Sequence, residues 1–236
     1  MDGTGPFIGI HENTVIMSFE KIYKAIFVKR INRFLMELNM NNTNILAHLH
    51  DPGRLEELLY PGNEIFIREA HGKKTDYSVT FIKNGDVYTF NDSRFHNKIA
   101  SNFIRPGYIS EVVVGNRRID FKYNNAYIEV KSCTLVNYGV AMFPDAVSER
   151  ASHHLDVLIN LINKGYDAYV LFLIFNSNAK SFAPNFDRDI KFSNKFIDAL
   201  KSGVKMRFLV FDTDLKNIYY KKEIYLDNSF INRFIK

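Results

Sequence analysis

The apolar run Ala168–Phe175 is the feature that most limits the folds open to this chain of 236 residues. A strand with one face in water alternates apolar and polar residues, whereas this run holds no charged residue and needs cover on both faces. Helical patterns flank it at about Pro144–Asn163 and near Asn194–Lys201, and a second apolar run follows at Met206–Phe211. Because a strand, a helix and a parallel strand join by a right-handed crossover, this half of the chain is predicted to be an α/β domain with a covered central strand.

The remaining elements of this half follow from periodicity and turn residues. A helix is predicted from about Ser93 to Ile104, a strand at Glu111–Val114, and a basic, tyrosine-rich hairpin with an end segment over Asp212–Lys236. In the helix that follows Phe143, Pro144 suits the first turn and Asp145 the positively polarised end. His154 lies on the apolar stripe of that helix, where a satisfied core histidine is the favoured interpretation.

Two short strands are predicted around Asn124-Asn125, because asparagine tolerates the positive φ that a two-residue hairpin loop requires. Counting outward from this loop sets Tyr123 opposite Ala126 and Asp120 opposite Glu129. Side chains alternate along a strand, so Lys131 shares one polar face with both acids. The hairpin is therefore predicted to bring two carboxylates and an amine together.

Like charges directly opposite each other destabilise a sheet, so the acidic pair predicts a cation between the two carboxylates. Mg²⁺ or Mn²⁺ is expected, since Mg²⁺ takes a few carboxylates, keeps several waters and binds phosphates. The Lys131 ammonium could orient an attacking water or stabilise charge on a phosphate. This layout resembles the PD-(D/E)XK phosphodiesterases, with Asp120, Glu129 and Lys131 as catalytic residues. The alternative is a surface hairpin with solvated charges, because the same acid-to-lysine spacing also occurs at Asp189 and Asp214.

Three further charged residues are candidates for the same site. Glu111 begins a strand and could supply a third carboxylate to the metal, or it could be an exposed strand-end charge. Glu149 and Arg150 lie in the helix predicted from about Pro144, which could aim a catalytic carboxylate at the metal and a guanidinium at phosphate. An ion pair within the helix is the alternative for these two.

The second half of the chain carries a set of motifs at Arg118 to Phe121, Tyr127 to Ser132, Thr134-Leu135, Gly139, Phe143 to Val147, Glu149-Arg150 and His154-Leu155, joined upstream by His48, Gly53-Arg54 and Pro61-Gly62. Together they resemble the sugar fermentation stimulation protein family. The resemblance implies an α/β (α+β overall) protein, with an OB-like nucleic-acid-binding barrel at residues 1–90 and a restriction-endonuclease-like PD-(D/E)XK mixed-sheet domain at residues 91–236. It also implies DNA binding and a role in sugar use. His50-Asp51-Pro52-Gly53 departs from the Pro-Asn-Ser/Thr-Gly run of the common bacterial pattern.

The first half of the chain has the alternation of short, half-buried strands, which suits a small barrel. The predicted strands lie within residues 14–36 and 44–49 and at Glu64–Arg68, Tyr77–Ile82 and Val87–Phe90. Turn residues bound the segment Asp51–Gly62, which is predicted to be a short helix. His48, His50 and Asp51 could form a metal site, but capping of the helix and strand is favoured.

Charge is unevenly distributed along the chain. Residues 1–90 carry 10 Lys and Arg against 11 Asp and Glu, whereas the remainder carries 21 against 15. Neutralisation of phosphates supplies most non-specific nucleic-acid affinity, so the second half is expected to lie on the phosphate backbone. Basic residues around Phe27 and Phe34 also suit stacking on single strands, or a solvated barrel edge. The expected nucleic-acid-binding residues are Lys24, Lys29, Arg30, Arg54, Arg118 and Arg150.

Other classes of protein are disfavoured by what the sequence lacks. Cys133 is its single cysteine, which excludes an internal disulfide framework and a cysteine-based zinc site. No window approaches a membrane span and no leader is recognisable, so a cytoplasmic location is expected. The expected function is a metal-dependent phosphodiesterase acting on nucleic acid, with DNA favoured as the partner. A non-catalytic DNA-binding regulator of sugar metabolism is the alternative, and a homodimer is compatible with the sequence.

Overall fold

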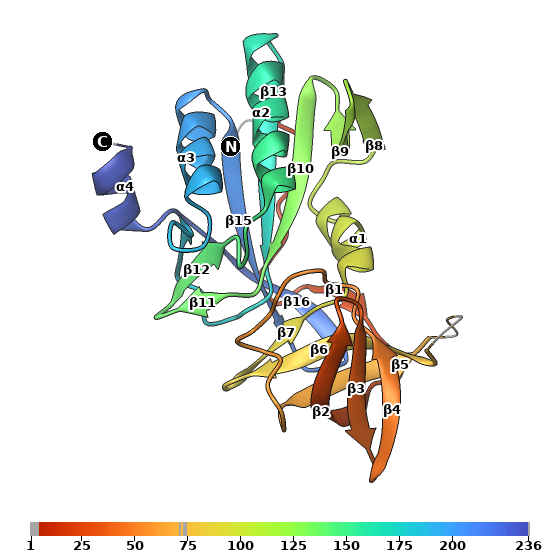
Figure 1. Ribbon diagram of the computed structural model, residues 1–236. Helices are drawn as coiled ribbons and strands as arrows, with labels where there is room; N and C mark the ends of the chain where they lie inside the picture. Colours follow the sequence, from red (N-terminus) through yellow and green to blue (C-terminus); the bar gives the residue numbers. More distant parts are fainter. Residues whose placement is uncertain (1–4, 71, 73–74, 236) are drawn as a thin grey trace.

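The computed structural model describes residues 5–70, 72 and 75–235, which form two sheet-containing domains joined at a narrow waist (Figure 1). Six strands make up the N-terminal domain, in the order β4-β3-β2-β5-β6-β7. A parallel pairing of Ala47 with Tyr77 and of His48 with Ser78 joins β4 to β6 and closes β2 to β6 into a barrel. The strands are β2 (Tyr23–Asn32), β3 (Leu35–Met40), β4 (Thr43–His48), β5 (Glu64–Glu69), β6 (Tyr77–Asn84) and β7 (Val87–Phe90). The predicted small barrel is confirmed.

Residues 51–62 do not form the helix predicted for them. They contain isolated turns, and in the first of these the backbone N–H groups of Leu58 and Leu59 donate to the carbonyl of Leu55. Leu55 and Leu58 are fully buried in the barrel core, and the φ of Leu55 is +52°. The segment between Pro52 and Pro61 is too short for a stable helix of its own, so packing of its leucines into the barrel decides its path.

Seven strands make up the sheet of the second domain, in the order β1-β16-β15-β13-β10-β9-β8. The central strands β10, β13 and β15 are parallel, and the outer pairs are antiparallel. The bounds are β1 (Val15–Ser18), β8 (Ile109–Val114), β9 (Arg117–Tyr123), β10 (Ala126–Cys133), β13 (Asp167–Ile174), β15 (Lys205–Thr213) and β16 (Asn217–Ile224). The predicted mixed α/β arrangement, with its crossovers through helices, is therefore confirmed.

Strand β13 is buried on both faces, as its apolar run predicts. Phe172 and its alternate neighbours pack into a core with α2 (Glu149–Asn163) and α3 (Ile190–Lys201). Leu173 and its alternate neighbours pack into a second core with α1 (His96–Ser101) and with barrel residues. Phe90 of the barrel meets Phe175 with ring centroids 5.1 Å apart. The barrel itself thus covers part of the sheet, and one apolar core joins the two domains.

Helix α2 begins five residues later than predicted, at Glu149. Ser148 is its N-cap, because the side-chain oxygen accepts a hydrogen bond from the N–H of Ala151 at 3.3 Å. Pro144 lies before the helix, where its carbonyl accepts a hydrogen bond from the Asn185 side chain at 3.0 Å. The carboxylate of Asp189 also accepts from the N–H of Ser148 at 2.8 Å. These contacts hold residues 144–148 against the chain before α3 and exclude them from the helix.

Several smaller elements differ from the predictions. The helix expected from Ser93 is divided into a short 3-10 helix, η1 (Ser93–Phe95), and α1. Helix α3 starts four residues earlier than expected, because the Asp189 carboxylate caps it by accepting from the N–H of Phe192 at 2.9 Å. The hairpin predicted within Asp212–Lys236 begins earlier than expected, because β15 supplies its first strand and β16 its second, and α4 (Asn228–Phe234) follows. A small sheet of β11 (Val136–Asn137), β12 (Val140–Phe143) and β14 (Ser181–Pro184) was not expected.

The N-terminal strand β1 belongs to the sheet of the second domain, although the barrel follows it in the chain. It pairs antiparallel with β16, with Met17 opposite Ile218. Phe19, just after β1, packs against Phe81 and Phe90 of the barrel at the boundary between the domains. The chain therefore crosses between the domains twice, after β1 and after β7. Among the described residues, no helix is long and apolar enough to cross a membrane.

Candidate functional site

The predicted hairpin around Asn124-Asn125 is formed by β9 and β10. Asn124 has a φ of +49°, as its turn requires. Tyr123 pairs with Ala126, and the register continues to Phe121 opposite Ile128. The next position in this register sets Asp120 opposite Glu129. The backbone pairing of the two strands ends with Phe121 and Ile128. Beyond it, the Asp120 carboxylate accepts a hydrogen bond from the N–H of Val130 at 2.7 Å.

Asp120 is half-buried and held in a fixed orientation. Its other carboxylate oxygen accepts a hydrogen bond from the Asn97 side chain of α1 at 3.0 Å. Burial and the neighbouring charge of Glu129 raise the pKa of Asp120 to about 6, against the lowering effects of Val130 N–H, Asn97 and Lys131. A carboxyl whose pKa is raised by burial and by a neighbouring acid lies where an added positive charge is favoured.

Glu129 is buried, with 2% of its surface exposed. Its Oε1 accepts from the Lys131 ammonium and contacts Nδ1 of His154 on α2. Burial alone would raise the pKa of Glu129, but the charge of Lys131 and the hydrogen bond with His154 hold it below its ordinary value. Its Oε2 is buried and has no hydrogen-bond partner within the described part of the chain. A buried, ionised oxygen without a partner is costly, so this atom calls for a ligand.

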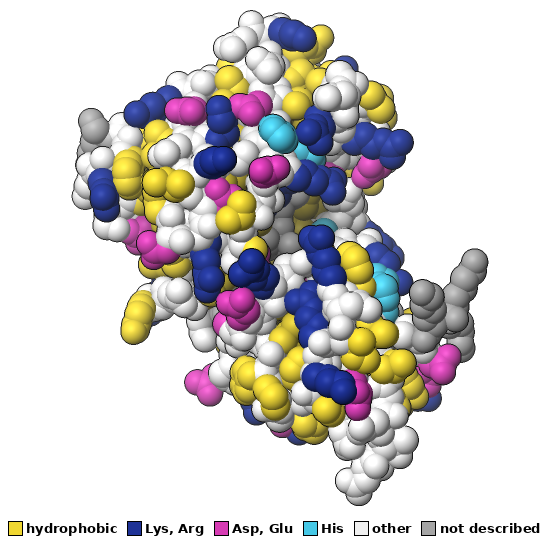
Figure 2. All heavy atoms as spheres, in the orientation of Figure 1, with side chains coloured by type: hydrophobic (Ala, Val, Ile, Leu, Met, Phe, Trp, Pro, Cys, Tyr) yellow, Lys and Arg dark blue, Asp and Glu magenta, His cyan; other side chains and the backbone are white. Residues whose placement is uncertain are grey.

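A pocket of about 420 Å³ opens over these residues at the waist between the domains. Strand β10 supplies Glu129 and Lys131 to its wall, and β9 supplies Asp120. The start of α2 supplies Ser148 and Arg150, the region of η1 and α1 supplies Arg94, His96 and Asn97, and Pro52 comes from the barrel. Figure 2 shows Lys and Arg side chains gathered along this waist on the face in view. The pocket is therefore acidic at its base and flanked by arginines.

The donor set suits a divalent cation held by two carboxylates. Asp120 and the unpartnered oxygen of Glu129 are hard ligands, and Mg²⁺ binds through one or two carboxylates while keeping several waters. Within the described residues, no group of three or more His, Cys, Asp and Glu is arranged to hold a metal ion. The remaining ligands would have to be water, backbone carbonyl and substrate oxygens.

The structure places the other predicted site residues less centrally. Glu111 has a φ of +56° and accepts a hydrogen bond from the Asn97 side chain at 3.3 Å, so it shares this donor with Asp120 but is largely exposed. Glu149 is the exposed first residue of α2 and does not line the pocket, whereas its neighbour Arg150 does.

The expected nucleic-acid-binding residues outside the pocket differ in what they contact. Lys24 pairs with Glu64, and Lys29 pairs with Glu37 at 3.3 Å. Arg30 donates to the backbone carbonyls of Arg33, Gly53 and Arg54, so it holds the loop after β4. Arg54 and Arg118 are exposed, each within 4.0 Å of an acid. Phe34 is 42% exposed, whereas Phe27 is 4% exposed and cannot stack on a base.

Several pocket residues were not predicted to act there. Asn97 is one of them, because asparagine has no signal that distinguishes a ligand-orienting role. His154 is a satisfied core histidine, as its stripe predicts, and the partner that satisfies it is Glu129. His96 lines the pocket and stacks on Phe175, and burial lowers its pKa to about 4. Arg94 also lines the pocket, beside the aromatic residues that fill the domain boundary.

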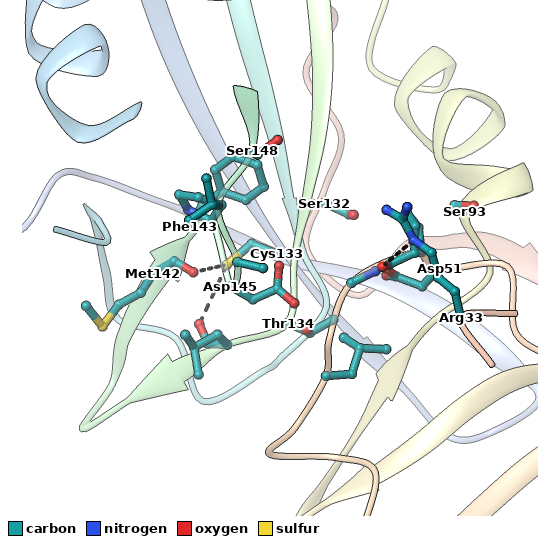
Figure 3. Close-up of a pocket in the computed structure, with 17 residues that line it drawn as sticks. Arg33, Asp51, Ser93, Ser132, Cys133, Thr134, Met142, Phe143, Asp145 and Ser148 are labelled. Atoms are coloured by element: carbon teal, nitrogen blue, oxygen red, sulfur yellow. Dashed lines mark hydrogen bonds between the residues drawn. The ribbon is translucent and has the colours of Figure 1, made fainter. Parts of the chain in front are cut away.

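A second cavity of about 220 Å³ adjoins the first and shares Ser132 and Ser148 with it (Figure 3). Asp51 from the barrel side and Asp145 from the other domain both lie beside Gly53: a Cβ on Gly53 would be 3.0 Å from Asp51 Oδ1 and 2.7 Å from Asp145 Oδ2. Burial raises the pKa of Asp51 to about 6, a shift that the Gly53 N–H opposes and the charge of Asp145 supports. Two acids therefore approach each other across the domain boundary.

The Asp51→Asn variant is expected to unfold at a higher temperature than the parent at about pH 7.5. The folded pKa of about 6 exceeds the ordinary 3.8, so stability falls as the pH rises from about 4 through about 6. Asparagine keeps the acceptor for Gly53 and removes this loss of stability, which we expect to be about 3 kcal/mol. Thermal unfolding of both proteins between about pH 4 and pH 8 measures it. Asp86→Asn, in an exposed turn, is the matched control. A gain that does not shrink toward about pH 4 contradicts the expectation.

The fold and the site define a two-domain protein in which an OB barrel precedes a mixed α/β domain with a paired-carboxylate pocket at the waist. Residues 28–90 match the family described as "SfsA N-terminal OB domain", and residues 94–217 match "Sugar fermentation stimulation protein RE domain". The chain belongs to the sugar fermentation stimulation protein family, as its motifs predict.

Similar proteins support this assignment over nearly the whole chain. A "Sugar fermentation stimulation protein homolog" of Picrophilus torridus is 52% identical over 93% of this chain and 97% of its own length. A protein of the same description from Sulfurisphaera tokodaii is 47% identical over 89% of this chain and 92% of its own. The solved structure of Pyrococcus furiosus SfsA in complex with Ca²⁺ superposes with a TM-score of 0.83 at 25% identity, covering 91% of this chain and 99% of that one.

Proposed function

We propose that this protein is a phosphodiesterase that cleaves nucleic acid, with DNA favoured as the substrate, and that it depends on Mg²⁺ or Mn²⁺. The observation that carries the proposal is the buried, unpartnered Oε2 of Glu129 beside Asp120, with Lys131 on the same strand. Such a pair of acids with an adjacent amine is suited to a divalent cation and to phosphate chemistry. The expected cytoplasmic location belongs to the same proposal.

A relative's structure supports the choice of a divalent cation. The Pyrococcus furiosus protein was solved in complex with Ca²⁺, and it shares the fold of this chain. Ca²⁺ and Mg²⁺ both take oxygen ligands, although Ca²⁺ takes more of them at longer distances. A bound Mg²⁺ or Mn²⁺ would supply Lewis-acid polarisation of a phosphoryl oxygen here.

The side chains of the pocket have separate roles in this proposal. Asn97 and the Val130 N–H orient Asp120, and His154 and Lys131 orient Glu129. The Lys131 side chain is 14% exposed, and its Nζ lies 3.4 Å from Nδ1 of His154. The ammonium is therefore held at the pocket wall, where it can orient water or stabilise phosphate charge. Arg150 is exposed at the start of α2 and lines the same pocket, so its guanidinium is free to bind a phosphate.

Cleavage assays on purified protein test the proposal. Single-stranded, duplex and branched DNA and RNA are incubated with Mg²⁺, Mn²⁺ or EDTA, beside Asp120→Asn and Lys131→Ala. We expect divalent-dependent cleavage that falls at least about 100-fold in both variants, because Asp120→Asn removes a charge that would hold the cation and Lys131→Ala removes a charge that would stabilise the reacting phosphate. Asp198→Asn and Lys201→Ala, on the exposed side of α3, are the matched controls. Nucleic-acid binding without cleavage of any substrate would instead support the non-catalytic DNA-binding regulator.

A further inference from the structure

The catalytic pocket continues across Arg94 into a groove on the barrel. Ser93, Arg94 and their neighbours in α1 line the pocket of Asp120 and Glu129 on one side. On the other side, Arg94 lines a groove together with His48, His50, Arg68, Ser78 and Phe95, which we call the barrel groove. A ligand that enters the catalytic pocket can therefore extend along the barrel past a single arginine. In Figure 2, a His side chain lies beside Lys and Arg side chains just below the waist.

Arg94 is built to hold an anion at this junction. Its Nε and Nη2 donate to the two carboxylate oxygens of Asp92 at 2.9 and 2.8 Å, yet 45% of its side chain stays exposed. Asp92 is fully buried and also pairs with Arg68, so one carboxylate serves two guanidinium groups and leaves an excess positive charge. Glu69, which also lines the groove, pairs with Lys21 and accepts from the Tyr23 hydroxyl. A guanidinium with a fixed orientation and free N–H groups suits a phosphate.

The aromatic rings in and beside the groove suit a base. Phe34 does not line the groove itself, but its ring is parallel within 3° to that of the lining residue His48, with centroids 6.0 Å apart, and the ring centroid of His48 lies 4.2 Å from that of His50. Phe34 is 42% exposed, so its ring is accessible to a ligand that leaves the groove. Burial lowers the pKa of His48 and takes that of His50 to about 4, so both rings are neutral near pH 7. Neutral flat rings bind base faces better than they bind phosphates.

We infer that the barrel groove binds an unpaired stretch of nucleic acid, with a phosphate on Arg94 and a neighbouring base stacked on Phe34 and His48. The identity of the ligand rests on the proposed function. Bases in a duplex stack on each other and hide their faces, whereas single strands can place them on aromatic side chains. The substrate of the adjoining pocket is therefore single-stranded next to the bond that is cleaved.

The chain contains no tryptophan, so Phe34→Trp introduces a single tryptophan as a fluorescent probe of the groove. With EDTA present to prevent cleavage, single-stranded DNA and single-stranded RNA are titrated separately, beside a duplex of the same length. We expect saturable quenching of tryptophan emission by at least one of the two single strands and at most a small fraction of that quenching by the duplex. Tyr225→Trp, 78% exposed on the C-terminal domain, should not respond to any of them.

Binding measurements on unlabelled variants complete the test. Phe34→Ala and His48→Ala should each weaken single-strand binding about 5- to 100-fold and leave duplex binding within about twofold, whereas Arg94→Gln should weaken single-strand binding by a similar factor because it removes the phosphate contact. Arg233→Gln on α4 is the matched control, and thermal unfolding of each variant shows that it is folded. Equal quenching by the duplex, or no quenching by either single strand, overturns the inference even if the protein cleaves DNA. Quenching by single strands in a protein that cleaves nothing overturns only the proposed function.

Discussion

Replacing Glu129 by Gln is expected to reduce divalent-dependent cleavage at least about 1,000-fold, equivalent to about 4 kcal/mol in the activation free energy. The substitution keeps the size of the side chain but removes the negative charge that Lys131, His154 and a metal ion would share. In the variant, the position of the unpartnered Oε2 is occupied by an atom of a neutral amide, either its oxygen or its nitrogen, and a neutral amide binds cations weakly. The same variant should therefore lose both binding of the divalent cation and cleavage of the substrate.

A second measurement separates loss of the metal from loss of the fold. Mn²⁺ that binds only the folded protein raises its unfolding temperature, and this rise should disappear in Glu129→Gln. Glu223→Gln is the matched control, because Glu223 also lies in the sheet and pairs with a cation, Arg207, at 2.6 Å. Glu129→Gln with near-parent cleavage and an intact Mn²⁺ effect would eliminate Glu129 as a metal ligand.

Replacing Asp92 by Ala is expected to lower the free energy of unfolding by about 3–5 kcal/mol. Asp92 is fully buried, accepts from both Arg68 and Arg94, and its side chain accepts from the N–H of Arg94 at the start of η1. Alanine would leave two guanidinium groups without their shared counter-charge, and the Arg68 side chain is only 15% exposed. Burial of an unpaired charge is much more costly than loss of a solvated ion pair.

Urea unfolding followed by circular dichroism measures this effect. The comparison is Asp212→Ala, which removes a similar contact to Lys221 between side chains that are 42% and 39% exposed. That exposed pair should contribute less than about 1 kcal/mol. Losses of equal size in the two variants would show that the Asp92 cluster contributes no more than a surface ion pair.

Elements with local signals were predictable from the sequence. The Asn124-Asn125 loop determines the register of β9 and β10, because a two-residue turn leaves one way to count outward. The apolar run that became β13 had no polar residue to place in water, so its cover on both faces followed from composition alone. The motifs of the family extended the prediction to the barrel, which matches the family's N-terminal domain.

Elements that depend on distant partners were not predictable in this way. Strand β1 forms because β16, about two hundred residues later, offers it an edge, and no pattern within β1 reveals that partner. The segment around Leu55 and Leu58 has a helical pattern, but its leucines gain more by burial in the barrel than by a short helix. Asn97 contacts Asp120 only because α1 packs on the sheet, so this hydrogen bond could not be predicted from the residues next to Asn97 in the sequence.

The position of β1 has a consequence for how the two halves can move. Two covalent links, one after β1 and one after β7, tie the barrel to the sheet, and Phe19 and Phe90 anchor both links in one apolar core. Any rotation of the barrel relative to the sheet must therefore bend both links together and disturb the apolar core that they share, so a double link restrains the two halves more than one linker would.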